Sequence, residues 1–234
     1  MNEAFEKITD WVFDLDNTLY PRHCDLFSQI DWKMTAYVQR LTGLDQGEAR
    51  VLQKRLYKEH GTTLNGLMRE YSIDPHHYLA DVHDIDYSRL EFNPELGREI
   101  SALPGRKHIF TNGDVRHAEN TLAAIGVPLD AFHSVFDIVA SSFIPKPQRE
   151  PYHAFFRHTG GEPTTSVMFE DMPRNLEAAK EMGMLTVLVV PREGVSHTAE
   201  AWELDGSSDN YVDHVTDDVG AFLSVLNKAR FPKG

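Results

Sequence analysis

The stretch WVFDLDNTLYP, residues 11–21, begins as an apolar run and then places two aspartates, Asp14 and Asp16, one residue apart. The run over residues 8–13 is typical of a buried strand. Because the two carboxylates carry the same sign, they repel each other where that strand ends. The stretch therefore predicts a positive group between the two aspartates, and a metal ion would answer the repulsion.

Length and composition are those of a globular protein with a sizeable core. The chain has 234 residues, enough for one large domain or a core with a smaller inserted domain. With one cysteine, Cys24, no internal disulfide is possible, and the N-terminus does not resemble a signal peptide, so we expect a cytoplasmic protein. The net charge of -13 argues against binding to nucleic acid or to a membrane, but it allows a small anionic substrate held by local cations.

Residues from about 22 to 90 show helical periodicity. Apolar residues recur at helical spacing between positions 26 and 41, and this pattern stops at Gly43. Two more helical patterns follow, one before Gly61 and one before Pro75. We expect an all-helical segment here.

After Pro94 the pattern alternates between strand and helix. Strands are predicted at 107–110, 135–140, 166–170 and 185–190, with helices near 115–125, 151–158, 173–182 and 219–229. Short apolar runs separated by helices imply a parallel sheet covered on both faces, which the strand at 8–13 joins. The predicted fold is α/β: a Rossmann-like parallel sheet core formed by residues 1–20 and 92–234, with an all-helical cap inserted at residues 21–91.

Each of the first four predicted strands of the core is followed by polar residues. These residues are Asp14 and Asp16, then Thr111, Asn112 and Gly113, then Lys146 between two prolines, and finally Glu170 and Asp171. In open α/β sheets, ligands bind beyond the carboxyl ends of the strands. Polar groups that converge from four apolar strands would be costly in a core, so this edge of the sheet is predicted to be a site.

The carboxylates at this edge suit metal-assisted chemistry. Asp14, Asp16 and Asp171 supply the hard oxygen ligands that Mg²⁺ prefers. Asp14 is a candidate nucleophile of the kind that forms an aspartyl-phosphate. Asp16, two residues further on, can reach the same reacting group and serve as general acid and then as general base.

The remaining strand-end residues suit a phosphoryl group. Thr111 offers a hydroxyl, while Asn112 and Gly113 offer backbone N–H groups just before a predicted helix, where anions are favoured. Lys146 offers a point charge. Together these groups predict an electrostatic cradle for a transferring phosphoryl group.

Each motif taken alone has a simpler explanation. D-x-D also begins calcium loops and sugar-nucleotide metal sites, and it occurs by chance. The calcium-loop explanation fails, because that loop has Gly sixth and Glu twelfth, where this chain has Leu19 and Asp25. The other motifs alone would be a turn, a solvated lysine and a helix start. Their shared position at strand ends favours a site.

The ordered set DLDNT (14–18), FTNG (110–113), Lys146 in PKP and FEDMPRN (169–175) resembles the four motifs of the haloacid dehalogenase-like hydrolase superfamily. Most members of that superfamily are Mg²⁺-dependent phosphatases. The resemblance spans the core from the first strand to about Val190, and it implies that the helical insert is the mobile cap of one subclass. The presence of Asp16 favours the phosphatase branch, because the dehalogenase branch lacks that acid.

The resemblance also implies a role for each matching residue. Many relatives have two aspartates in the last motif, so Glu170 departs from the pattern and its contact with the metal, direct or through water, stays open. The implied roles are Asp14 as nucleophile, Asp16 as general acid/base with its backbone carbonyl on Mg²⁺, Thr111 and Lys146 as phosphate binders, Asp171 as metal ligand, Glu170 acting on the metal through water, and Asn175 in an outer shell.

A finer resemblance concerns the substrate. HDIDYSRL (83–90), FNPEL (92–96) and LPGRKHIFTNGDVRHAENTLAAIG (103–126) resemble bacterial proteins described as pyrimidine 5'-nucleotidases, which are related to fungal enzymes that dephosphorylate UMP and CMP. The implied activity is hydrolysis of a pyrimidine nucleoside 5'-monophosphate. The alternatives are a broad-specificity phosphatase of sugar or small organic phosphates, and a non-catalytic regulatory module that binds metal or phosphate.

Candidate contacts to the leaving group flank the predicted cap. They are Tyr20, Arg22 and His23 after the nucleophile, and His83 and Tyr87 near the cap's return. A tyrosine such as Tyr20 or Tyr87 can stack on a base, although packing explains each of them more simply. The 12 histidines show no zinc-binding spacing, so we assign none to a metal, and we expect His117 to face solvent. Nothing in the sequence indicates the oligomeric state.

Overall fold

Six parallel strands form the centre of the computed structural model, which describes residues 2–192 and 210–230. The order across the sheet is β3-β2-β1-β4-β5-β6, and every adjacent pair is parallel. The predicted α/β fold with a parallel sheet is confirmed. The strands are β1 (Asp10–Phe13), β2 (Arg106–Phe110), β3 (Ser134–Phe136), β4 (Ser166–Glu170), β5 (Leu185–Val189) and β6 (His214–Thr216).

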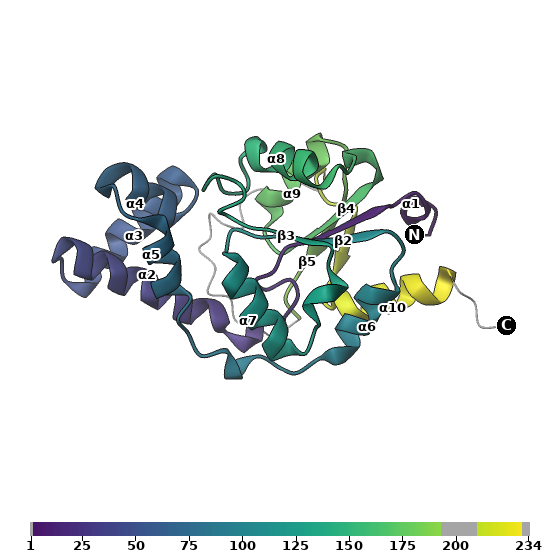
Figure 1. Ribbon diagram of the computed structural model, residues 1–234, viewed down its shortest axis with the longest axis horizontal. Helices are drawn as coiled ribbons and strands as arrows, with labels where there is room; N and C mark the ends of the chain where they lie inside the picture. The colour runs from purple at the N-terminus through teal and green to yellow at the C-terminus, as the bar shows by residue number, and fades with distance from the viewer. Residues whose placement is uncertain (1, 193–209, 231–234) are drawn as a thin grey trace.

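Helices cover both faces of this sheet. Figure 1 shows α8 and α9 on one face and α6, α7 and α10 on the other. The helices of the core are α1 (Asn2–Glu6), α6 (Pro94–Ala102), α7 (Val115–Ile125), α8 (Arg149–Thr159), α9 (Pro173–Glu181) and α10 (Val219–Arg230). Side chains of a strand alternate between faces, so Trp11 and Phe13 join one hydrophobic cluster and Val12 joins the other.

The third strand is shorter than its apolar pattern predicts. We expected a strand at 135–140, but β3 ends at Phe136. The reason is Asp137, whose carboxylate accepts the backbone N–H of Ala140 at 2.8 Å and that of Val115 at 3.1 Å. These bonds turn the chain away from the sheet. Strand β6 was not predicted, and β1 begins at Asp10 instead of residue 8.

Four helices between the first two strands form a layer beside the sheet, at the left of Figure 1. They pack on each other around their own apolar cluster, which includes Val38, Leu56 and Leu67. The predicted helical segment is therefore present, while its limits at residues 21 and 91 stay a prediction. We call this layer the cap; it contains α2 (Leu26–Thr42), α3 (Gln46–His60), α4 (Thr63–Tyr71) and α5 (Pro75–Val82).

Short 3-10 helices occur in the segments that join these elements. Two of them lie on the connections between cap and core, η1 before α2 and η2 after α5. None of the helices in the described ranges has the length and apolarity needed to cross a membrane. The 3-10 helices are η1 (Arg22–Cys24), η2 (Tyr87–Arg89), η3 (Leu129–Ala131) and η4 (Pro163–Thr165).

Candidate active site

The residues that follow the central strands meet at one edge of the sheet. β2 and β4 pair with β1 on its two sides, so the three strand ends are adjacent. A cavity of about 430 Å³ lies between this edge and the cap. The residues predicted for the site that line this cavity are Asp14, Asp16, Arg22, His83, Thr111, Asn112, Gly113, Lys146, Glu170, Asp171 and Asn175.

The buried ammonium group of Lys146 joins three strand ends. Its Nζ donates to Asp14 Oδ1 at 2.8 Å, to the Phe110 carbonyl at 2.8 Å and to Glu170 Oε1 at 2.9 Å. Burial lowers the pKa of Lys146, but the two carboxylates raise it more, so that the net shift is upward and the amine stays charged. Lys146 is thus a positive group against Asp14.

Asn112 holds the backbone of Lys146 in place. Its Oδ1 accepts the Lys146 N–H at 2.9 Å, and its Nδ2 donates to the Lys146 carbonyl at 3.2 Å. The Gly113 N–H donates to Thr111 Oγ1 at 2.9 Å, so this predicted anion donor already has a partner. The side chain of Asn112 therefore positions a cation, a role that the sequence analysis did not assign to it.

Glu170 is engaged on both of its oxygens. Oε1 accepts from Lys146 and from Asn175 Nδ2, and Oε2 accepts the Met172 N–H at 2.6 Å. Asp171, the next residue, accepts one bond from the guanidinium of Arg22. Arg22, a predicted contact to the leaving group, lines the cavity and forms an ion pair with this carboxylate.

Three of these carboxylates are close enough to hold a cation together. Asp14, Glu170 and Asp171 each place an oxygen within 4.8 Å of the other two, and all are buried. Burial, with repulsion from neighbouring carboxylates, raises the pKa of Asp14 to about 7 despite Lys146, and raises the pKa of Asp171 well above its usual value. Additional positive charge would relieve this repulsion, and an all-oxygen donor set fits Mg²⁺.

A family comparison agrees with this geometry. The family model described as "Hydrolase: haloacid dehalogenase-like hydrolase" matches residues 12–183. The chain belongs to the haloacid dehalogenase-like hydrolase family. The matched range includes every strand-end residue described above, from Asp14 to Asp171.

Individual proteins similar to this hydrolase are more distant. Phosphate metabolism protein 8 of Saccharomyces cerevisiae is 24% identical over 190 residues, which are 74% of this chain and 59% of that protein. The chain thus spans about three fifths of the length of this curated relative.

Solved structures share the fold of this hydrolase. The L-2-haloacid dehalogenase from Xanthobacter autotrophicus has a TM-score of 0.58 and 20% identity, with 97% of this chain and 100% of that chain covered. The putative hydrolase YfnB from Bacillus subtilis, bound to magnesium, has a TM-score of 0.58 and 14% identity, with 94% and 99% covered.

The second aspartate of the hydrolase motif has its own partners. Asp16 Oδ1 contacts His117 Nε2 at 2.8 Å and accepts the Tyr20 hydroxyl at 2.6 Å. The prediction that His117 faces solvent is wrong, because its side chain is fully buried. It shares the buried face of α7 with Thr121, four residues on, so helical periodicity could have indicated its burial.

Asp16 and His117 each affect the charge of the other. Burial raises the pKa of Asp16, but the positive charge and hydrogen bond of His117 outweigh it and lower that pKa to about 2. Burial lowers the pKa of His117, and Asp16 more than compensates, so that the pKa of His117 is raised. No single cation lies between Asp14 and Asp16 among the described residues; instead Lys146 contacts the first and His117 the second.

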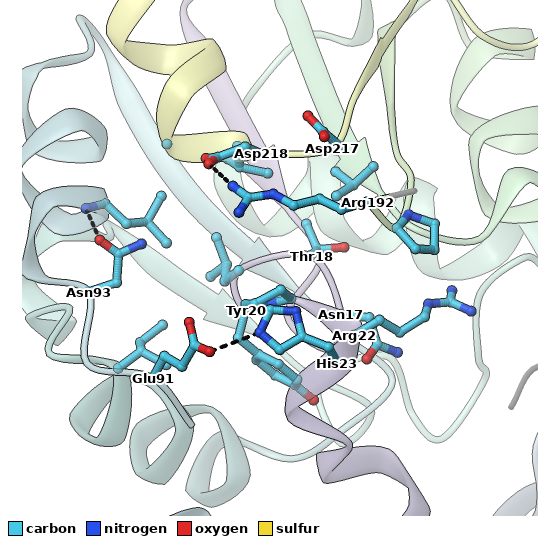
Figure 2. A pocket seen from close by; sticks show the side chains of 18 of the residues that line it. Asn17, Thr18, Tyr20, Arg22, His23, Glu91, Asn93, Arg192, Asp217 and Asp218 are labelled. Atoms are coloured by element: carbon cyan, nitrogen blue, oxygen red, sulfur yellow. Dashed lines mark hydrogen bonds and ion pairs between the residues drawn. The ribbon is translucent and has the colours of Figure 1, made fainter. Parts of the chain in front are cut away.

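Three residues expected to contact the leaving group do not line the cavity. Tyr20 and His23 lie at a smaller pocket of about 130 Å³, where His23 contacts Glu91 at 2.9 Å (Figure 2). Tyr87 donates its hydroxyl to the His83 carbonyl at 3.1 Å and contacts His117 Nδ1 at 2.9 Å. The expectation that Tyr20 or Tyr87 stacks on a base is therefore not supported by their positions.

The cavity wall contributed by the cap includes aromatic residues that the sequence analysis missed. Phe27 and Trp32 of α2 line the cavity, and Trp32 remains 58% exposed. Both lie outside the apolar stripe by which this helix was predicted, and a large aromatic residue off the buried stripe was the signal available in the sequence. Tyr57 of α3 also lines the cavity and accepts a hydrogen bond from Arg174 at 2.6 Å.

Proposed function

We propose that this hydrolase is a Mg²⁺-dependent phosphomonoester hydrolase that works through an aspartyl-phosphate on Asp14, with pyrimidine nucleoside 5'-monophosphates as substrates. The observation that carries the proposal is the second carboxyl group, that of Asp16, which lines the same cavity as Asp14. An alkoxide leaving group needs a proton, whereas a halide does not, so a positioned acid supports phosphate ester hydrolysis.

The reaction has two steps. An Asp14 carboxylate oxygen attacks phosphorus, the bond from phosphorus to the leaving oxygen breaks, and Asp16 gives that oxygen a proton. Water then attacks phosphorus, Asp16 takes a proton from the water, and the bond from phosphorus to Asp14 breaks to release phosphate. Without substrate Asp16 is ionised, since its pKa is lowered to about 2 by His117 against the effect of burial. The negative charge of a bound phosphoryl group raises that pKa toward the acid form.

Side chains around Asp14 bind and orient the phosphoryl group. Lys146 and Thr111 line the cavity beside Asp14, where the ammonium group balances charge on the non-bridging oxygens and the hydroxyl can donate a hydrogen bond to one of them. Asp14, Asp171 and the Asp16 carbonyl would hold Mg²⁺, with Glu170 acting through water, and the ion would supply Lewis-acid stabilisation of the same oxygens. The engagement of both Glu170 oxygens by protein donors supports its contact through water.

The names of two similar proteins support this proposal. The yeast relative is called a phosphate metabolism protein, and the Bacillus subtilis structure is described as bound to magnesium. Neither name specifies a nucleotide.

The shape and lining of the cavity support a nucleotide as substrate. Its volume of about 430 Å³ lies in the range of roughly 300–1,000 Å³ that is usual for small-molecule sites. Trp32 and Phe27 offer flat surfaces on which a base can stack. Asp31, which contacts Arg50 at 2.8 Å and Lys54 at 3.0 Å on the same wall, favours the second candidate, a phosphatase of sugar or small organic phosphates, because such groups bind hydroxyls.

The test is phosphate release from UMP, CMP, dUMP, AMP, GMP and several sugar phosphates, with Mg²⁺ or with EDTA. Asp14→Asn is the inactive control, and chloride release from 2-chloropropionate tests dehalogenation. Mg²⁺-dependent release that favours UMP and CMP supports the proposal. Release without base preference supports the second candidate, and no release from any ester supports the regulatory binding module.

A pair of cap variants tests the aromatic wall. Trp32→Ala removes a stacking surface worth roughly 1–3 kcal/mol, so KM for UMP should rise about tenfold. Tyr71→Ala is the matched control, because Tyr71 is an exposed aromatic of the cap that does not line the cavity. Equal KM values in the two variants would contradict stacking on Trp32.

A further inference from the structure

One oxygen of Asp16 is held by two side chains that the proposed reaction does not use. Oδ1 contacts His117 Nε2 at 2.8 Å and accepts the Tyr20 hydroxyl at 2.6 Å. Oδ2 accepts no hydrogen bond from residues in the described part of the chain, and the carboxyl group lines the cavity. The carboxyl group is therefore tethered on one side and available to substrate on the other.

The ring of His117 is itself fixed from several directions. Nδ1 contacts the Tyr87 hydroxyl at 2.9 Å, and the backbone N–H donates to Asp114 Oδ1 at 2.8 Å. The His83 ring stacks on the His117 ring, with centroids 4.3 Å apart and an angle of 13° between the planes. Because both ring nitrogens and one ring face have partners, the direction of Nε2 toward Asp16 is set by packing.

Two of these supports come from the return connection of the cap. His83 follows α5, and its Nδ1 contacts Asp114 Oδ1 at 3.1 Å, the same oxygen that caps α7. Tyr87 lies in η2, on the same connection. The path from the cap to Asp16 thus runs through side chains in direct contact.

We propose that His117 is a positioning residue that holds the Asp16 carboxyl group with Oδ2 toward the leaving oxygen, and that His83 and Tyr87 keep its ring in that orientation. This inference rests on the proposed phosphatase function. His117 does not contact the substrate in this proposal. By orienting Asp16, it acts on the proton transfer from Asp16 to the leaving oxygen in the first step, when the bond from phosphorus to that oxygen breaks.

The dependence on the leaving group distinguishes this role from a structural one. An alkoxide leaving group needs the proton from Asp16, whereas p-nitrophenolate is stable without it. His117→Leu keeps the approximate size of the side chain and removes the donor. We expect kcat/KM for UMP and for ribose 5-phosphate to fall about 10- to 100-fold, which is part of the roughly 10²–10⁴-fold contribution of general acid–base catalysis, with little change for p-nitrophenyl phosphate.

Three further variants complete the experiment. His117→Gln restores an N–H donor near the Nε2 position and should recover part of kcat/KM for the alkyl esters. His108→Leu is the matched control, since His108 is a buried histidine that contacts a carboxylate, Asp10 Oδ1 at 3.1 Å, in the body of the sheet, and it should not change the ratio between esters. Tyr20→Phe removes only the second hydrogen bond to Asp16 Oδ1. If His117→Leu does not fold, this variant tests whether fixing that oxygen matters more for alkyl esters than for p-nitrophenyl phosphate.

Several results would overturn the inference. An equal fall for alkyl and aryl esters in His117→Leu and in Tyr20→Phe would assign these residues to general stability, while the phosphatase function would stand. Unchanged kcat/KM for both ester classes would show that proton transfer by Asp16 does not need the His117 contact. If the wild-type protein releases phosphate from neither class, the proposed function and this inference both fail.

Discussion

Replacing Lys146 by methionine should destabilise the core of this hydrolase far more than the loss of an ordinary buried lysine. Lys146 is 1% exposed, and its ammonium group makes three hydrogen bonds, two of them to the buried carboxylates of Asp14 and Glu170. Methionine keeps most of the side-chain volume, so the substitution creates little cavity. What it removes is the positive charge between two buried negative ones.

The expected loss follows from that geometry. Removing one partner of a buried ion pair costs about 3–5 kcal/mol, because the other charge stays buried without compensation. The Phe110 carbonyl also loses a donor, which adds about 1 kcal/mol. Asp14 can relieve part of the repulsion by binding a proton, since burial already raises its pKa to about 7. We therefore expect a net loss of about 3–4 kcal/mol at pH 7.5 without Mg²⁺.

The loss should depend on pH in a defined direction. Without Lys146 the pKa of Asp14 rises further, above its value in the unfolded chain. Between those two pKa values the folded state binds more protons than the unfolded state, so its stability falls as pH rises. The difference between wild type and Lys146→Met should therefore be larger at pH 8 than at pH 5.5.

Urea unfolding in EDTA at both pH values measures this difference. Lys107→Met is the matched control, because the ammonium group of Lys107 is also buried but, among the residues that the structure describes, donates only to the carbonyls of Leu103 and Gly105. Addition of Mg²⁺ should restore part of the stability of Lys146→Met and none of that of Lys107→Met. Equal losses in the two variants, or a loss that does not change with pH, would refute the reasoning.

Three other substitutions test separate parts of the molecule. Asp10→Asn should lower the free energy of unfolding by about 1–3 kcal/mol at pH 7, because burial raises the pKa of Asp10 but its hydrogen-bonded partners lower it more. The stability that comes from this lowered pKa is lost as pH falls through the pKa of the folded state. The difference from wild type in urea unfolding should therefore shrink below about pH 4. Gly66→Ala places a Cβ 2.7 Å from Leu56 Cβ in the cap and should cost about 1–3 kcal/mol by overpacking, which an unchanged Tm would contradict. Asn112→Ala removes both hydrogen bonds from the Asn112 amide to the backbone of Lys146, so kcat/KM should fall roughly 10- to 100-fold because that cation is misplaced. Retained activity would contradict the positioning of Lys146 by Asn112.

Local patterns predicted the central strands and the polar residues that follow them. The apolar runs before Asp14, Thr111 and Glu170 are strands, and the parallel order brings their ends together. Such patterns work here because the period of a strand or a helix is a property of consecutive residues. They fail where a side chain bonds to the backbone, as Asp137 does when it ends β3 after three residues.

Contacts between distant segments lie beyond what such patterns describe. His117 and Asp16 are 101 residues apart in sequence, and their contact depends on how α7 packs beside the end of β1. Trp32 lines the cavity because the cap lies over the strand ends, and its position along α2 alone does not show this. The hydroxyls of Tyr20 and Tyr87 contact Asp16 and His117, whereas the sequence analysis took both tyrosines as candidate contacts to the leaving group.

The sequence by itself determined the α/β alternation, the inserted helical segment and the ordered strand-end motifs with their carboxylates and lysine. Only the tertiary structure decided which cation faces which carboxylate: Lys146 lies against Asp14, Arg22 against Asp171 and His117 against Asp16. The physical reason is the distance along the chain over which each effect acts. Backbone periodicity depends on consecutive residues, whereas buried charges pair when segments distant in sequence pack together. A buried charge left without a partner would cost too much free energy to keep.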